Sequence, residues 1–392
     1  MRVGIFTDVY YPYISGVVTS VNSLYKALTN LGCEVYIICV NSKKRKYEKE
    51  GNIIKIPGSR GPSPFGDYDM KYEFPIKATK LVKELNLDII HTNTEGMIGI
   101  LGRHMGKKLN IPVVHTAHTI YEDSASYLTK GHFKRLGVIG AKAFVKFFLI
   151  KQVKEIITPG EKSYKCLKDK YKIKQNVTII PNGIDKDIYN SNFSKETLYN
   201  KKKELDIVNN FVLLWVGRLG YEKNIRFLIN AQKEVIKKHK NCKLLMVGTG
   251  PEEQSLKKLA EKNGLKDNII FMGSIPNDEV ALYYNIADLF VTASYGETQG
   301  LTVIEAMACS LPVVAIKDES YERVITDYKN GIFFKDQNEY IKNISYLINH
   351  KEELNKMKKE ALKTSSDYSI EKFAKEVLKV YKKAIKEYSL IK

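Results

Sequence analysis

The sequence predicts an α/β protein made of two doubly wound parallel sheets. Short apolar runs typical of buried strands alternate with segments that carry apolar residues at helical spacing, starting with a strand at residues 3–6 and a helix closed by Gly32. The chain has 392 residues, which is too long for one ordinary α/β core and long enough for two. A polar passage separates two such series of strands. These three observations predict two domains, each with helices on both faces of a parallel sheet.

The polar passage follows the motif PNGID and extends to Asn210, and we place an interdomain linker in it. The expected N-terminal domain is residues 1–188, the C-terminal domain is residues 189–366, and a last segment, residues 367–392, carries a helix at residues 370–388. Strands are expected at residues 3–6, 34–40, 52–56, 88–92, 113–116, 155–158 and 177–180 before the passage, and at residues 211–216, 243–247, 268–272, 288–292, 312–316 and 331–334 after it.

Charge and composition limit the partners and the compartment. The chain has 63 basic and 44 acidic residues, a net charge of +19, which favours polyanionic neighbours such as anionic membranes, phosphorylated ligands or nucleic acid. The five cysteines show no paired spacing for a metal site or a disulfide framework, so a reducing cytoplasm is expected. No run approaches the ~20 apolar residues that span a bilayer. A soluble or peripheral protein is therefore expected.

The most informative stretch is residues 293–315, which reads as strand, loop, helix and strand. In a parallel sheet such a loop lies at the carboxyl edge, where ligands bind, and the backbone N–H groups of Leu301 and Thr302 would face an anion. Glu297 lies in the loop and Glu305 one turn inside the helix. Two carboxylates beside an anion site suit a ligand with hydroxyls and phosphate. The alternative for Glu305 is simple stabilisation by the helix dipole.

Two cations follow the first strand of the second series. Arg218 and Lys223 lie in VGRLGYEKN, where they are expected to converge on one side of a ligand site. Fixed cations stabilise the charge that develops on a leaving diphosphate more than they stabilise the ground state. The alternative is two solvated surface cations.

Glycines mark two further loops. Gly16 lies between the first strand and its helix, where glycine would allow unusual dihedrals and a close approach to a phosphate or sugar. The three-glycine dinucleotide fingerprint is absent, which argues against a dehydrogenase. Gly248 and Gly250, in VGTGPE, form a comparable loop after a strand of the second series.

Of the seven histidines, His118 is the candidate for function. It follows the strand at residues 113–116, at the carboxyl edge, where a neutral imidazole could hydrogen-bond a sugar hydroxyl or orient an acceptor. His115 is expected to be a core histidine within the strand.

The segment 130–154 has seven Lys or Arg residues and no acidic residue. On a helical wheel its cations and its aromatics gather on different sides, a pattern that favours binding to a membrane surface. The alternative is a core helix with a solvated face. The residues of the expected membrane or acceptor side are Lys134, Arg135, Lys142, Lys146, Phe144 and Phe147.

Taken together and in order, the motifs resemble those of glycosyltransferase family 4, whose members have the GT-B fold of two Rossmann-like domains facing a cleft. The matching motifs are SGV, HTAHT, PNGID, GRLGYEKN, VGTGP and ETQGLTVIEAMA. Within the family, HTNTEG, HTAHTIYEDSASY and ETQGL are similar to bacterial diacylglycerol glucosyltransferases. The resemblance implies a retaining hexosyltransferase that moves a hexose, most simply glucose, from a UDP-sugar to 1,2-diacylglycerol at the cytoplasmic face of the membrane. It also implies that the final helix packs back on the first domain.

The same resemblance implies a role for each candidate. Glu297 would bind hydroxyls of the donor sugar, Glu305 the ribose, and His118 would act at the sugar side of the reaction centre. No cofactor is obligatory, and Mg²⁺ is possible but not required. The remaining implied donor-binding residues are Gly16, Arg218, Lys223, Gly248, Gly250, Thr298, Gln299, Gly300 and Leu301.

Three alternatives stay open. A soluble or polysaccharide acceptor is the first, since neither the fold nor the donor site selects an acceptor. A basic, non-enzymatic nucleotide- or RNA-binding protein is the second, although no aromatic and basic recognition motif supports nucleic acid as a partner. The third is metal binding by Asp67 and Asp69, which imitate the aspartates of another glycosyltransferase fold.

Overall fold

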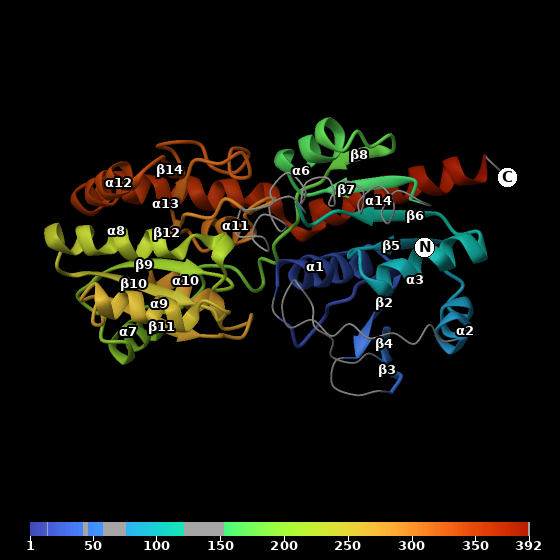
Figure 1. The fold of residues 1–392 in the computed structure, drawn as a ribbon, viewed down its shortest axis with the longest axis horizontal. Helices are drawn as coiled ribbons and strands as arrows, with labels where there is room; N and C mark the ends of the chain where they lie inside the picture. The colour runs from blue at the N-terminus through green and yellow to red at the C-terminus, as the bar shows by residue number, and fades with distance from the viewer. Residues whose placement is uncertain (14, 42–45, 58–75, 121–152, 391–392) are drawn as a thin grey trace. The chain divides into compact units, whose positions relative to one another are not determined.

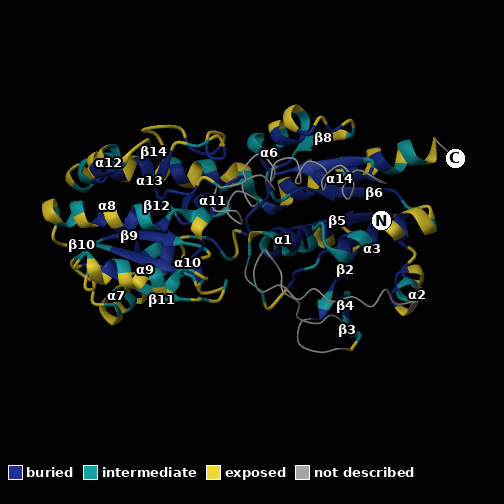
Figure 2. Cartoon of the chain, in the orientation of Figure 1, coloured by how far each residue is buried: buried dark blue, intermediate teal, exposed yellow. Residues whose placement is uncertain are grey.

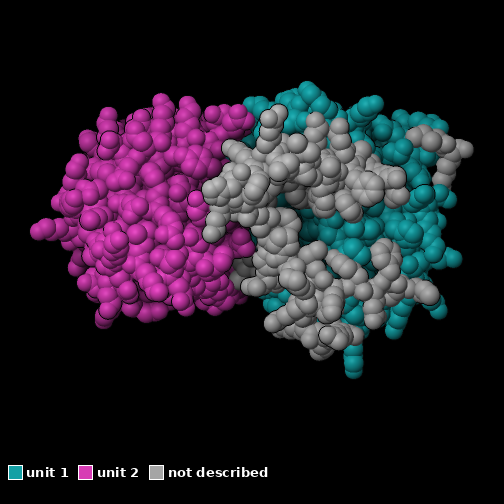
Figure 3. All heavy atoms as spheres, in the orientation of Figure 1, with its two compact units in different colours: residues 1–183, 370–392 teal, residues 184–369 magenta. Residues whose placement is uncertain are grey.

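The computed structural model describes residues 1–13, 15–41, 46–57, 76–120 and 153–390. The chain forms two compact units, coloured separately in Figure 3. Unit 1 comprises Met1–Gly183 and Ile370–Lys392, and unit 2 comprises Ile184–Ser369. The break between the units therefore falls inside the PNGID motif, before the polar passage in which a linker was expected.

Unit 1 is built on an eight-stranded sheet with the order β3-β4-β2-β1-β5-β6-β7-β8 (Figure 1). All neighbouring strands are parallel except β3 and β4. The short β3 was not expected, because its three residues carry no apolar side chain. The strands are β1 (Arg2–Phe6), β2 (Glu34–Asn41), β3 (Glu48–Glu50), β4 (Ile53–Pro57), β5 (Ile89–Thr92), β6 (Val113–Thr116), β7 (Glu155–Thr158) and β8 (Asn176–Ile179).

Helices cover both faces of this sheet. Strand residues alternate between the two faces, so Val3 and Ile5 of β1 pack with one group of helices and Phe6 packs with the other. The first group is α1 (Gly16–Asn30) and α14 (Ile370–Ser389), and the second includes α2 (Ile76–Glu84) and α3 (Met97–Leu109). A helix α6 (Glu161–Lys165) and a π-helical turn η2 (Cys166–Lys170) precede β8.

The helix α14 is fastened to the sheet of unit 1 by polar contacts in the core. The hydroxyl of Tyr381 lies 2.7 Å from His91 Nδ1, and His91 Nε2 lies 2.7 Å from Thr116 Oγ1. Lys383 also pairs with the fully buried carboxylate of Glu155 at 2.7 Å. These contacts join the last helix of the chain to β5, β6 and β7.

Replacing Tyr381 with phenylalanine is expected to destabilise unit 1 by about 1–3 kcal/mol, because it leaves a buried ring nitrogen of His91 without its partner. Thermal unfolding measures the loss. Tyr388→Phe, on the half-exposed end of the same helix, is the matched control and should change stability by less than about 0.5 kcal/mol. Equal effects of the two substitutions would show that the contact with His91 does not stabilise the protein.

Unit 2 has a six-stranded parallel sheet with the order β11-β10-β9-β12-β13-β14. One hydrophobic core runs through it, seen as the dark strands and inward helix faces of Figure 2. Its strands are β9 (Phe211–Val216), β10 (Cys242–Val247), β11 (Ile269–Gly273), β12 (Leu289–Thr292), β13 (Val313–Ile316) and β14 (Gly331–Phe334). Its helices are α7 (Lys195–Glu204), η3 (Tyr221–Lys223), α8 (Ile225–Lys238), α9 (Glu253–Lys262), α10 (Val280–Ile286), α11 (Leu301–Ala308), α12 (Gln337–Asn349), α13 (Lys351–Ser365) and η4 (Ser366–Tyr368).

The predicted α/β class with two doubly wound sheets is confirmed, and the polar passage in which we expected a linker contains a helix. That passage holds α7, which has no buried residue and therefore no apolar stripe that a sequence pattern could reveal. Leu198 of α7 packs, partly buried, on the core of unit 2.

Within the described ranges, no helix combines the length and the apolar character needed to cross a bilayer.

In both units the strand order reverses at the first strand in sequence. In unit 2 the chain runs outward from β9 through β10 to β11 and then continues on the other side of β9 with β12. In unit 1 the corresponding neighbours are β1 and β5. Loops that leave two such strands diverge and open a crevice at the carboxyl edge of the sheet. The residues after β9, β12, β1 and β5 are therefore where ligand sites are expected.

Candidate functional site

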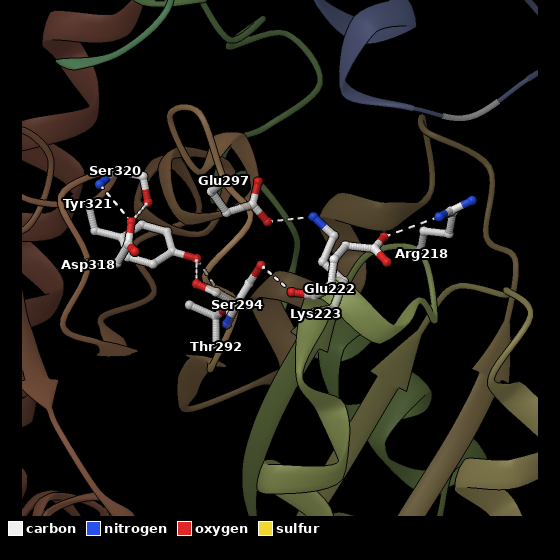
Figure 4. A network of polar contacts seen from close by, with 9 residues as sticks. All are labelled: Arg218, Glu222, Lys223, Thr292, Ser294, Glu297, Asp318, Ser320 and Tyr321. Carbon is white, nitrogen blue, oxygen red and sulfur yellow. Dashed lines mark hydrogen bonds and ion pairs between the residues drawn. The ribbon is translucent and has the colours of Figure 1, made fainter. Parts of the chain in front are cut away.

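The loops after β9 and β12 meet in unit 2 through an ion pair between two candidate residues. Lys223 ends the short helix η3, and its Nζ lies 2.6 Å from Oε1 of Glu297 in the loop that follows β12 (Figure 4). Each side chain is 21% exposed, so the pair is largely but not completely shielded from water. An ammonium group and a carboxylate are thus held side by side at the reversal point of the sheet.

Arg218 also lies in the loop after β9, but it pairs with a residue of its own loop and not with the β12 loop. Its Nη2 is 3.3 Å from Oε1 of Glu222, and its side chain is 46% exposed. The carbonyl of Glu222 accepts a hydrogen bond from Ser294 Oγ at 3.4 Å, which joins the β9 loop to the β12 loop. The two predicted cations therefore follow β9 as expected. Lys223 pairs with Glu297 of the β12 loop, and Arg218 pairs within its own loop.

The start of α11 is shaped by Gly300 and Tyr321. Gly300 precedes the helix with a φ of +76°, and no side chain caps the first turn. A Cβ at this position would come within 2.5 Å of the Tyr321 ring, so both the backbone angle and the packing require glycine. The Tyr321 hydroxyl donates to the carbonyl of Ser294 at 3.2 Å, and burial with the nearby charge of Glu297 raises its pKa.

The other predicted residues of this loop differ in accessibility. Gln299 is 4% exposed, whereas Thr298 and Leu301 are half-buried beside the loop surface. Thr298 and Leu301 are therefore more accessible than Gln299 among the residues predicted around the start of α11.

The carboxylate of Glu305 is hydrogen-bonded by a side chain from the core of unit 2. Its side chain is almost fully buried, and Oε2 accepts a hydrogen bond of 2.8 Å from the hydroxyl of Tyr284 on α10. Burial raises the pKa of Glu305 to about 7, although hydrogen bonds from Tyr284 and Tyr189 lower it in part. The carboxylate thus lies on the second turn of α11 among tyrosines of the core.

The raised pKa of Glu305 has a consequence for stability. Between the ordinary value of 4.5 and about 7 the folded protein holds a proton that the unfolded chain has lost, so this group makes folding less favourable as pH rises through that window. Glu305→Gln carries no charge, so its stability relative to the wild type should rise between pH 5 and pH 8, by roughly 3 kcal/mol at most. Thermal unfolding of both proteins across this range measures the difference. A difference independent of pH would contradict the assignment.

The glycine loops have different explanations. A Cβ on Gly248 would overlap the carbonyl oxygen of Gly217, and one on Gly250 would lie 2.5 Å from the carbonyl of Leu219. Both glycines therefore let the β10 loop pack under the β9 loop. At Gly16 the expectation of unusual dihedrals is wrong, because it is an ordinary first residue of α1 after the N-cap Ser15, and a Cβ would meet no atom within 4 Å. No packing contact among the described residues therefore requires glycine at position 16.

In unit 1, His118 lies half-buried after β6, and its Nε2 is 3.1 Å from Oδ1 of Asn93. Burial lowers the pKa of His118 to about 4, so the imidazole is neutral at physiological pH. His115 is fully buried within β6 and contacts Thr92 Oγ1 at 2.8 Å, which confirms the expectation of a core histidine. The predicted Glu297 and Lys223 belong to unit 2, and His118 and Gly16 to unit 1.

Sequence reasoning missed several residues that contact the candidates, among them Asn93, Tyr284 and Tyr321. Asn93 directly follows β5 at the carboxyl edge, so the rule that singled out His118 could also have found it. The two tyrosines reach their partners from other elements, and no local pattern marks them. The predicted Lys134, Arg135, Lys142, Lys146, Phe144 and Phe147, like Asp67 and Asp69, lie outside the described residues.

The fold and the site define the class. Solved structures that superpose on nearly the whole chain are GT-B glycosyltransferases: the Anabaena protein HepE in complex with UDP has a TM-score of 0.74 at 17% identity over 98% of this chain and 100% of that one. Sucrose-phosphate synthase from Thermosynechococcus elongatus has a TM-score of 0.76 at 19% identity over 97% and 98%. The protein has the GT-B fold.

Sequence comparison gives the family. Residues 14–188 match Glycosyltransferase Family 4, and residues 199–364 match Glycosyl transferases group 1. An alpha-monoglucosyldiacylglycerol synthase from Acholeplasma laidlawii is 36% identical over 97% of this chain and 96% of its own length. One from Streptococcus pneumoniae is 37% identical over 85% of this chain and 75% of its own length. The chain belongs to glycosyltransferase family 4, and the protein is a glycosyltransferase.

Proposed function

We propose that the protein transfers glucose from UDP-glucose to 1,2-diacylglycerol, with retention of configuration, at the inner surface of the cell membrane. The observation that carries the proposal is the likeness, at 36% and 37% identity over most of the chain, to two relatives named alpha-monoglucosyldiacylglycerol synthase. UDP-glucose is itself an α-glycoside, so an α-linked product corresponds to retention. The UDP and UDP-glucose complexes of the structural relative HepE support a uridine nucleotide donor.

On the donor side, Lys223 and Glu297 of unit 2 bind different parts of the UDP-sugar. An ammonium group has three N–H donors, so Lys223 can keep Glu297 in place and still donate to a diphosphate oxygen. Arg218, exposed at the same edge, adds a second cation, and the amides at the start of α11 bind the remaining phosphate oxygens. Glu297 accepts hydrogen bonds from hydroxyls of the transferred sugar, and Glu305 accepts one from the ribose.

The chemistry then needs no covalent nucleophile from the protein. The acceptor hydroxyl oxygen bonds to the anomeric carbon on the face from which the bond to the phosphate oxygen breaks. Its proton passes to that leaving phosphate oxygen, and UDP departs. The cations stabilise the charge on the diphosphate as the bond breaks, while Glu297 orients the sugar. Because Lys223 and Arg218 supply this neutralisation, no metal ion is obligatory, although Mg²⁺ could bind the diphosphate.

On the acceptor side, membrane binding is supported by the net charge of +19 and by the basic and aromatic pattern of residues 130–154. Near an anionic leaflet each cation contributes about 1 kcal/mol, so four of them suffice for reversible attachment with help from inserted aromatics.

The test uses the full-length protein with UDP-[¹⁴C]glucose and vesicles of phosphatidylglycerol that contain diacylglycerol. We expect label in the lipid fraction, an α-anomeric product by NMR, and activity that persists in EDTA. Vesicles of phosphatidylcholine and diacylglycerol should support less transfer, because the anionic surface is missing. Label on a soluble or polymeric sugar alone would overturn the lipid acceptor, and transfer only from UDP-galactose or UDP-N-acetylglucosamine would overturn the donor.

A further inference from the structure

Tyr321 lies in the loop after β13 and contacts the loop that carries Glu297 (Figure 4). The strands β12 and β13 are parallel neighbours with Thr292 opposite Ala315, so the two loops leave the sheet side by side. The backbone N–H of Tyr321 donates to the carbonyl of Asp318 at 3.1 Å, and this turn brings the tyrosine hydroxyl back to the end of β12. The residue is 1% exposed, in the core of unit 2.

The hydroxyl of Tyr321 closes a ring of hydrogen bonds around the backbone of Ser294. It donates to the carbonyl of Ser294 at 3.2 Å, and Thr292 Oγ1 lies 3.4 Å from it. Because a hydroxyl has one proton, Thr292 is the donor in that second contact. The backbone N–H of Ser294 in turn donates to Thr292 Oγ1 at 3.4 Å. Each bond is long and weak on its own, but the three residues are at most 4% exposed, so little water competes for them.

The hydroxyl keeps the proton that this ring requires. Burial and the nearby charge of Glu297 raise the pKa of Tyr321, although the contacts with Thr292 and Ser294 lower it in part. Since the ordinary value for tyrosine already lies well above neutral pH, the hydroxyl is a donor throughout the physiological range.

The aromatic ring of Tyr321 contacts the other end of the same loop. A Cβ on Gly300 would lie 2.5 Å from it, so the ring packs directly against the backbone of Gly300, which precedes α11. Tyr321 therefore contacts the loop at two points, Ser294 through its hydroxyl and Gly300 through its ring. Glu297 lies midway between them, three residues after Ser294 and three before Gly300.

Ser294 also joins this loop to the one that carries Lys223. Its Oγ donates to the carbonyl of Glu222 at 3.4 Å, and Lys223, the next residue, pairs with Glu297 at 2.6 Å. The backbone of Ser294 is thus held by Tyr321, and its side chain by the β9 loop. Both members of the ion pair lie close in sequence to a contact of Ser294.

We propose that Tyr321 is a positioning residue for glycosyl transfer, which holds residues 294–300 so that Glu297 and the amides at the start of α11 face one donor molecule together. This proposal rests on the proposed function, which assigns the donor sugar to Glu297 and the phosphates to those amides. A misplacement of about 1 Å in such a pair of groups costs up to about a hundredfold in rate. Tyr321 is itself too deeply buried to contact the substrate.

The test compares Tyr321→Phe with the wild type in the full-length protein. Phenylalanine keeps the ring against Gly300 and removes the hydroxyl, so only the contact with Ser294 is lost. We expect kcat for transfer from UDP-glucose to fall about three- to thirtyfold, while the Kd of UDP, measured by calorimetry, changes less than about twofold. A lower melting temperature with unchanged kcat, or a higher KM with unchanged kcat, would overturn the positioning role.

Tyr340→Phe is the matched control. Tyr340, on α12, is fully buried in the same core, and its hydroxyl has no hydrogen-bond partner among the residues that the structure describes. The control removes a buried tyrosine hydroxyl without breaking a contact, so kcat and the affinity for UDP should stay at wild-type values. An equal fall of kcat in both variants would show that the contact with Ser294 is not the cause, against the proposal.

A second variant breaks the same ring of hydrogen bonds at another point. Thr292→Val keeps the shape of the side chain and removes its hydroxyl, whereas Tyr321 can still donate to Ser294. The fall of kcat should be smaller than in Tyr321→Phe, and the double variant should be no slower than Tyr321→Phe alone. Losses that multiply would mean that the two hydroxyls act separately, which contradicts the closed ring.

The combination with Glu297→Gln shows whether Tyr321 acts through Glu297. A displaced carboxylate contributes less to the transition state, so Glu297→Gln should lower kcat less in the Tyr321→Phe background than in the wild type. The same fold loss in both backgrounds would show that Tyr321 does not position Glu297, and the proposal would fail.

Hydrogen exchange, followed by mass spectrometry, reports on the loop without any substrate. Peptides that cover residues 293–301 should exchange faster in Tyr321→Phe than in the wild type and in Tyr340→Phe. Unchanged exchange in these peptides would overturn the role of Tyr321 in holding the loop, whatever the rates. Absence of transfer from UDP-glucose by the wild-type protein would instead overturn the proposed function, and the exchange experiment distinguishes this outcome from the failure of Tyr321 to hold the loop.

Discussion

Glu297→Gln is expected to lower kcat for glycosyl transfer by roughly 10²- to 10³-fold while leaving the fold intact. The carboxylate is held 2.6 Å from Lys223 at the reversal point of the unit 2 sheet, in the loop that leads from β12 to α11 (Figure 4). Glutamine keeps the size of the side chain and one acceptor oxygen. It loses the charge that strengthens hydrogen bonds from sugar hydroxyls as the anomeric carbon becomes positive. Initial rates with saturating UDP-sugar measure the loss.

The loss should lie in turnover and not in folding. Glu297 and Lys223 are each one-fifth exposed, and an ion pair at that exposure contributes at most about 1 kcal/mol to stability. Circular dichroism and the melting temperature should therefore stay close to those of the wild type. Glu261→Gln, exposed at the end of α9, controls for the chemical change. A rate for Glu297→Gln within threefold of that control would remove Glu297 from the reaction.

Much of the fold could be predicted from the sequence because most of its strands and helices show a local pattern of apolar residues. Each expected strand is present, and most of them are the apolar runs typical of strands buried in a parallel sheet. The two elements that we did not predict, β3 and α7, lack such a local pattern. The strand β3 has the sequence Glu-Lys-Glu and pairs with β4 at the edge of the sheet. The helix α7 has no fully buried side chain. Neither leaves a pattern that could be read without the neighbouring elements.

The candidate site was partly predictable for a topological reason. Parallel strands bring their carboxyl ends to one edge, so Lys223 after β9 and Glu297 after β12 could be placed near each other from their positions alone. The partners of each side chain could not be predicted. Glu305 meets Tyr284 and His118 meets Asn93 across different elements, and such contacts depend on side-chain directions that no spacing along the chain encodes.

Gly16 shows the limit of reading a residue type alone. The sequence suggested unusual backbone angles there, yet the structure gives it an ordinary helical start with open space beside it. Gly300, by contrast, combines a positive φ with a close approach by the ring of Tyr321. A glycine in a loop after a strand therefore has at least two explanations, and its backbone angles and neighbours in the structure distinguish them.

Lys223→Met is expected to lower kcat by about a hundredfold or more and to weaken binding of UDP. Methionine preserves the length of the side chain and removes the ammonium, which lies 2.6 Å from Glu297. Arg218→Met should cost less, because the 46% exposed guanidinium already shares its charge with Glu222 and with water. Initial rates give the loss in kcat, and calorimetric titration with UDP gives the loss in affinity.

The double variant Lys223→Met with Glu297→Gln tests whether the pair acts as a unit. Residues in direct contact that serve one step show strongly non-additive effects, so the double variant should be little slower than the slower single variant. Fully multiplicative losses would mean that Lys223 and Glu297 act on the donor independently, and that their 2.6 Å contact is replaced when substrate binds. Lys223 would then serve the diphosphate alone, and Glu297 the sugar alone.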